Sequence, residues 1–92
     1  MKRDRILYGV VNFGREMEHC LIADHKFEEA YQIERAREQM IYYLFKHSMK
    51  DFKNMLHSMF HYDHWEYKPG YFVFDETTRT LLVELYNKLF KC

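Results

Sequence analysis

Residues 27–45, FEEAYQIERAREQMIYYLF, are the stretch on which the fold prediction rests. Their apolar side chains recur three or four residues apart, the spacing that places side chains on one side of an α-helix. Glu28 and Glu29 lie where negative charge favours the start of that helix. We therefore predict a helix over 27–45, with an apolar side formed by Phe27, Ala30, Tyr31, Ile33, Ala36, Met40, Ile41, Leu44 and Phe45.

A second helix is expected directly after the first. Ser48 and Asp51 have the spacing of a capping box, in which a serine hydroxyl accepts a hydrogen bond from the backbone N–H three residues later. This spacing predicts a break at 47–48 and a new helix over about 49–62. A connection this short favours antiparallel or sharply angled packing of the two helices. The apolar stripe of the second helix consists of Met49, Phe52, Leu56, Met59 and Phe60.

The N-terminal part of the chain favours a β-hairpin. Residues 6–13, ILYGVVNF, are β-branched and aromatic, which is typical of a strand. Gly14 supplies turn chemistry, so residues 17–23 can return as a second strand, although the same segment can also begin a helix. Asp24 is the expected N-cap of the helix that follows.

The C-terminal part adds a third strand and a third helix. Pro69 and Gly70 mark a turn, residues 71–74 (YFVF) favour a buried strand, and Asp75 is a capping residue for the helix after it. That helix has an apolar stripe of Leu82, Leu85, Tyr86 and Leu89. The predicted fold is therefore a single α+β domain over residues 1–92, in the order β(β)ααβα, with helices packed on one face of a two- to three-stranded antiparallel sheet.

Composition indicates a folded domain without a strong overall charge. The chain is 48% hydrophobic and 18% aromatic, which is enough for a sizeable core. Its 14 basic and 14 acidic residues balance, which argues against bulk binding of nucleic acid. The charge is nevertheless patchy: residues 1–15 have four basic residues against one acidic, and residues 16–38 have seven acidic against three basic. Patches of both signs suit a protein partner better than a duplex.

Cysteine usage and hydropathy indicate a cytoplasmic protein. Cys20 and Cys92 form no disulfide framework, so a reducing cytosol is the expected compartment. The apolar run over residues 6–11 is too short for a signal peptide or a membrane span. His19 and His25 lie near Cys20, but we expect this thiol to be a small buried hydrophobe and not a nucleophile.

A histidine row is the sharpest candidate for chemistry. His57, His61 and His64 are spaced by four and three residues, and a pair four apart on a helix can bind Zn²⁺. His64 lies at or past the expected helix end, and no glutamate occupies the general-base position of a zinc protease motif. We therefore favour a solvated histidine-rich face, and we expect no cofactor.

The preferred binding face combines this row with lysines and aromatic residues. Lysines and histidines recur along one side of the second helix, and aromatic residues follow at its end. Aromatic side chains beside charges are typical of protein hot spots, and they also suit stacked bases. The residues predicted to bind a partner are Lys50, Lys53, His57, His61, Tyr62 and Trp65.

The function that this pattern favours is non-catalytic protein binding. A small regulator or inhibitor that docks on a larger enzyme or complex fits it, and one encoded by a virus or a mobile element would fit this description too. The alternatives are a binder of nucleic acid or nucleotides that uses the lysine and histidine face, and a histidine-rich metal-binding domain. Met55 and Tyr62 lie off the main apolar stripe and predict residual apolar surface for a homodimer or another partner.

Overall fold

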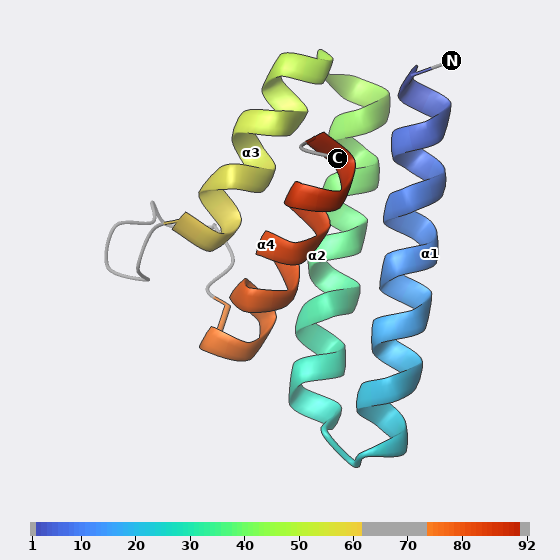
Figure 1. Cartoon of the computed structure of the whole chain (residues 1–92), viewed down its shortest axis with the longest axis vertical. Helices are drawn as coiled ribbons and strands as arrows, with labels where there is room; N and C mark the ends of the chain where they lie inside the picture. Colours follow the sequence, from blue (N-terminus) through green and yellow to red (C-terminus); the bar gives the residue numbers. More distant parts are fainter. Residues whose placement is uncertain (1, 62–73, 91–92) are drawn as a thin grey trace.

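A computed structural model describes residues 2–61 and 74–90, and almost all of them are helical. The four helices are α1 (Lys2–Ala23), α2 (Phe27–Lys46), α3 (Met49–His61) and α4 (Glu76–Phe90). Successive helices run in opposite directions, so the chain goes down, up, down and up (Figure 1). α1 and α2 form a long antiparallel pair, and α3 and α4 pack against it. This is the topology of a four-helix bundle.

The predicted α+β fold is wrong for the described residues, which contain no strand or sheet. Residues 6–13, expected as a strand, and residues 17–23, expected as its partner or as a helix start, both lie within α1. Only residue 74 of the third predicted strand is described; it is not helical, and residues 71–73 lie outside the described part of the chain.

Two glycines explain why the first strand prediction failed. A Cβ atom on Gly9 would lie 2.8 Å from Cδ2 of Leu89, and one on Gly14 would lie 2.6 Å from Cδ of Arg37. These glycines therefore allow α4 and the Arg37 side chain to approach α1 closely; they do not break the chain into strands and turns. The β-branched residues around them follow helical spacing, with Ile6 and Val10 fully buried. Strand propensity is weak where helical packing of this kind competes with it.

The helices expected from apolar spacing are confirmed. α2 and α3 match the predicted helices over 27–45 and 49–62 within one residue. The predicted cap at Ser48 is present, because its Oγ accepts a hydrogen bond of 3.1 Å from the N–H of Asp51. The predicted cap at Asp75 is present too, with Oδ1 accepting from the N–H of Thr78 at 2.9 Å.

Asp24 is not the N-cap of α2. The residue at that position is Lys26, which makes no side-chain capping bond. Instead, the end of α1 forms a Schellman motif, in which the N–H of Lys26 donates to Leu21 O at 2.8 Å and the N–H of His25 donates to Ile22 O at 3.0 Å. His25 has the left-handed backbone conformation that this motif requires, with φ of 62°.

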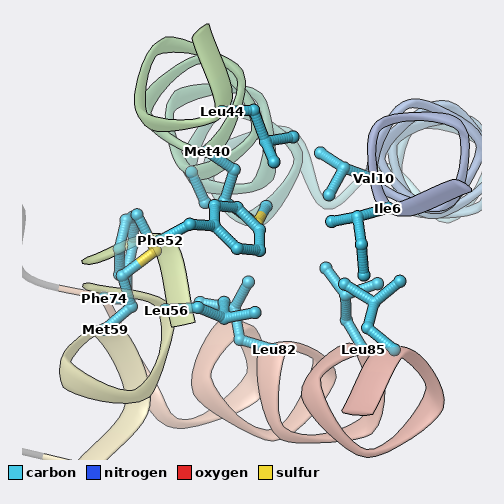
Figure 2. Packing of buried hydrophobic residues seen from close by; sticks show 12 residues of the cluster. Ile6, Val10, Met40, Leu44, Phe52, Leu56, Met59, Phe74, Leu82 and Leu85 are labelled. Atoms are coloured by element: carbon cyan, nitrogen blue, oxygen red, sulfur yellow. The ribbon is translucent and has the colours of Figure 1, made fainter. Parts of the chain in front are cut away.

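The main core joins all four helices. Phe52 of α3 lies at its centre, fully buried between Met40 and Leu44 of α2 on one side and Leu56 and Leu82 on the other (Figure 2). Its remaining members are Ile6, Val10, Ala36, Met59, Phe74, Leu85 and Leu89. A second, smaller cluster of Leu21, Ala30 and Ile33 lies near the turn between α1 and α2. Met55, expected to leave apolar surface exposed, is half-buried and packs against the main core.

Candidate functional site

The structure brings part of the predicted binding face together on α3. Lys50 and Lys53 are exposed, and His57 is half-buried on the side of α3 that faces α4. His61 is the last residue of α3, but its side chain lies outside the described part, as do Tyr62, His64 and Trp65. The described residues therefore include the N-terminal half of the predicted face.

A ladder of rings fills the seam between α3 and α4. The His57 ring makes edge contacts with Phe60, at 5.2 Å between centroids, and with Tyr86 of α4, at 5.9 Å. Phe60 and Tyr86 are 5.5 Å apart, and Tyr86 is 5.2 Å from Phe90. Edge and tilted contacts at these distances are favourable beyond the area they bury. His57 thus holds the two helices together as well as contributing to their surface.

The lysines lie beside this ladder. The ammonium of Lys53 is 5.3 Å from the ring centroid of Phe90, within the range of a cation–π contact. Lys50 lies one turn earlier on the same helix and is exposed. Within the described residues, neither lysine forms an ion pair with a carboxylate. We call Lys50, Lys53, His57, Phe60, Tyr86 and Phe90 the α3–α4 face.

The metal hypothesis gains no support from the part of the site that is described. The described residues hold no group of three or more histidine, cysteine, aspartate or glutamate side chains placed to bind a metal ion. His57 packs between two aromatic rings. Because the side chains of His61 and His64 lie outside the described part, the complete triad stays a prediction.

Cys20, predicted to be buried, is exposed. α1 turns this residue away from Leu21, its buried neighbour, because consecutive residues of a helix point about 100° apart. The nearby His25 ring contacts Phe27, with centroids 6.0 Å apart, and thus has a packing role.

Two arginines near the N-terminus donate hydrogen bonds to the C-terminal ends of other helices, a role that the sequence prediction did not include. Arg3 Nη1 donates to Leu44 O, and it also donates to His47 O at 3.4 Å; both carbonyls lie at the end of α2. Arg5 Nη2 donates to Leu89 O at the end of α4, at 3.4 Å. Cations favour helix C-termini, where carbonyl groups lack intrahelical partners. The positive patch of residues 1–15 is therefore partly used inside the fold.

A half-buried ion pair links the C-terminal half of α1 to the middle of α2. Arg37 Nη1 donates to Glu18 Oε2, and the stem of Arg37 crosses Gly14. Burial raises the pKa of the Glu18 carboxyl above its ordinary value; nearby Arg37 lowers it, while Glu34 and Glu38 raise it further. The α1–α2 pair therefore has an acidic patch near its middle.

The exposed aromatic residues of α2 are a surface that the sequence prediction missed. The predicted apolar side of α2 includes Phe27, Tyr31 and Phe45, yet these residues are 59%, 52% and 68% exposed. Tyr42 is 52% exposed. The buried side consists of Ala30, Ile33, Ala36, Met40 and Leu44. The sequence contained a signal for this surface. The predicted apolar residues occupy more of the helix circumference than one buried stripe requires, which indicates that some of them stay exposed.

Comparisons with protein-family models, curated proteins and solved structures gave no match to this chain. Among the described helices, none has the length and apolar character needed to cross a membrane.

Proposed function

We propose that this chain is a non-catalytic protein-binding module, and that its α3–α4 face docks on an acidic, partly apolar segment of a larger protein. The observation that supports this most directly is the position of Lys53, whose ammonium lies over Phe90 at the edge of the ring ladder. Lys50 extends the positive charge by one turn. A partner can thus contact cations and aromatic surface together.

The chemistry of the face suits this partner. Aromatic side chains supply large contact areas at low entropic cost, and they are frequent among the residues that dominate binding energy. The two lysines lack a carboxylate partner within the described residues, so acidic side chains of a bound segment would complement them. Such a module acts by covering the surface that it binds, as small regulators and inhibitors do.

A reducing, cytoplasmic location is part of the proposal. Cys20 is an exposed free thiol on α1. An exposed thiol is readily oxidised in secretory compartments and persists in the cytosol, where thiols are kept reduced.

Selection from a displayed library of random peptides tests the proposal. The immobilised wild-type chain should select peptides that combine acidic and apolar residues. In the variant Lys50→Glu/Lys53→Glu, we expect the affinity of the selected peptides to fall by about tenfold or more, which corresponds to about 1.4 kcal/mol. α3 should tolerate the change, because both residues are exposed and the first of the two lies in the first turn of the helix, where negative charge is favourable.

The matched control is Lys2→Glu/Lys26→Glu, which makes the same change in net charge at exposed positions outside α3. Peptides that bind this control as weakly as the α3 variant would be responding to net charge alone, and the proposed face would be wrong. Selection of peptides without acidic residues would also contradict it. Binding of short oligonucleotides that weakens steeply with salt and is lost only in the α3 variant would assign the face to nucleic acid instead.

A further inference from the structure

The side of α2 that faces away from the core carries an ordered stripe of six residues. Successive members are four, four, three, four and three residues apart, an average of 3.6, so they share one side of the helix. We call this set the α2 outer stripe; it consists of Phe27, Tyr31, Arg35, Glu38, Tyr42 and Phe45. All four of its aromatic side chains are more than half exposed. Large exposed apolar side chains gathered in this way mark interaction sites.

The order of chemistry along the stripe is the same from both ends. Two aromatic residues are followed by a charged residue, a residue of opposite charge and two more aromatic residues. Counted inward from the two ends, the paired positions are 27 with 45, 31 with 42, and 35 with 38. The residue numbers in each pair add to 72 or 73, so all three pairs have nearly the same midpoint along the helix. A two-fold axis near the middle of the stripe would therefore place Phe27 opposite Phe45, Tyr31 opposite Tyr42 and Arg35 opposite Glu38.

We propose that a second copy of this chain covers the α2 outer stripe, with the two α2 helices antiparallel about a two-fold axis. Such an interface is self-complementary, because the same patch serves both copies. The Arg35–Glu38 contact would form twice, once on each side of the axis. A parallel pair would instead place Glu38 opposite Glu38 and Arg35 opposite Arg35, and like charges in contact oppose association.

Arg35 already lies along the stripe in the single chain. Its guanidinium is 5.5 Å from the Tyr31 ring centroid, and its Nη1 donates to the Tyr31 hydroxyl at 3.5 Å. Glu38, one turn further on, is exposed. The Arg35 guanidinium, which would contact Glu38 of the other copy, is thus already held against the Tyr31 ring, which the dimer would bury.

The exposed area is of the size that a dimer needs. A buried aromatic side chain removes about 150–250 Å² from water, so side chains that are half to two-thirds exposed each have about 100–150 Å² left to bury. The four aromatic residues then contribute about 800–1,200 Å² across both copies, close to the lower bound of about 1,000 Å² for a specific interface. Arg35, Glu38 and the flanking residues would add to this area.

This inference does not depend on the proposed function, because the stripe lies on α2 and the α3–α4 face lies on two other helices. A protein could dimerise through α2 and bind nothing through α3, or the reverse.

Sedimentation velocity of the full chain over a wide concentration range tests the dimer. We expect a concentration-dependent dimer in the wild type. Tyr42→Ser/Phe45→Ser should weaken it by about tenfold or more, because the changes remove one inner and one outer aromatic anchor from each copy. Tyr8→Ser is the matched control, since Tyr8 is an aromatic residue of α1 that is 72% exposed; it should leave the dimer unchanged. Circular dichroism should show the same helix content in all variants.

Charge variants test the register. Glu38→Arg gives each copy two arginines at the centre of the stripe, and Arg35→Glu gives each copy two glutamates. Each variant alone should be monomeric at concentrations where the wild type is a dimer, and an equimolar mixture should form a heterodimer. This rescue requires residues 35 and 38 of one copy to lie against residues 35 and 38 of the other, which a merely destabilised variant would not produce.

Cysteine cross-linking tests the direction, in chains that also carry Cys20→Ser and Cys92→Ser. Tyr31→Cys mixed with Tyr42→Cys should form a disulfide between copies. Phe27→Cys alone should not, because antiparallel packing would separate the two copies of residue 27 by about 27 Å along the helix. A wild type that stays monomeric at all concentrations, a dimer that the α2 variants leave intact, failed rescue by the charge mixture, or a residue 27 disulfide would each overturn the proposal.

Discussion

Replacing Thr78 with valine should stabilise the protein, because the described part of the fold buries this hydroxyl without giving it a hydrogen bond. Thr78 is fully buried, and its Oγ1 has no hydrogen-bond partner among the described residues. It occupies the third position of α4, where a capping-box side chain would normally accept from the N–H of the capping residue. Here that N–H, of Asp75, is taken by Gln32 Oε1 of α2 at 2.9 Å. The N–H of Thr78 is itself satisfied by Asp75.

The size of the effect follows from the chemistry of the exchange. A buried polar group without a partner costs about 1–3 kcal/mol. Valine has nearly the shape of threonine and a similar helix propensity, so Thr78→Val removes that cost without opening a cavity. We expect the free energy of unfolding to rise by about 1–2 kcal/mol. For a domain of this size, each kcal/mol raises Tm by about 4–8 °C.

Chemical and thermal denaturation of matched variants measure this gain. Thr77→Val and Thr80→Val make the same exchange at exposed positions of α4 and should change the free energy of unfolding by less than about 0.5 kcal/mol. Thr78→Ser keeps the hydroxyl and removes a methyl group, so it should destabilise the protein by about 1 kcal/mol. If Thr78→Val is no more stable than the wild type, the hydroxyl has a partner in solution and the reasoning fails.

Three further predictions concern α1 and α2. His25→Gly should raise the free energy of unfolding by about 0.5–1 kcal/mol, because glycine adopts a φ of 62° without the steric cost that histidine bears; urea denaturation showing a loss would contradict this. Glu38→Gln should lower the pKa of the Glu18 carboxyl, since the negative charge of Glu38 helps to raise it, and an NMR titration that leaves this pKa unchanged would exclude that electrostatic effect. The raised pKa means that the folded state binds the proton of the Glu18 carboxyl more readily than the unfolded state does. The wild type should therefore gain stability relative to Glu18→Gln as the pH falls through the raised pKa toward 4.5. If the free energy of unfolding by urea varied with pH in the same way for both proteins, no such linkage would exist.

The sequence was a good guide to α2, α3 and α4 because each has an apolar stripe and, for the last two, a cap that acts locally. Ser48 and Asp75 form the bonds that their spacing predicted. α1 was misassigned because its β-branched residues and glycines have local preferences that packing overrides. The contacts that decide its state, Gly9 with Leu89 and Gly14 with Arg37, join residues far apart in the chain. No local pattern contains them.

The candidate site was predictable only in part for a similar reason. Exposure of Lys50 and Lys53 follows from helical periodicity, and both are exposed. The position of Lys53 over Phe90, and the packing of His57 on Tyr86, require α4 to lie beside α3. The aromatic residues of α2 were missed because apolar character alone does not say which side of a helix its neighbours cover. A side that none of the described helices covers becomes visible only when all four of them are placed.

The two proposed surfaces together make a specific claim about binding strength. A dimer joined through α2 would carry two α3–α4 faces, so a target that presents several acidic segments would bind both and gain effective concentration without any new contact. The wild type should then dissociate more slowly from a surface densely coated with a selected peptide than from a sparse one. Tyr42→Ser/Phe45→Ser, which keeps the α3–α4 face but should be monomeric, should dissociate at the same rate from both surfaces. If this variant retained slow dissociation from the dense surface, the second binding face would have to come from within one chain, and the link between dimerisation and avidity would be wrong.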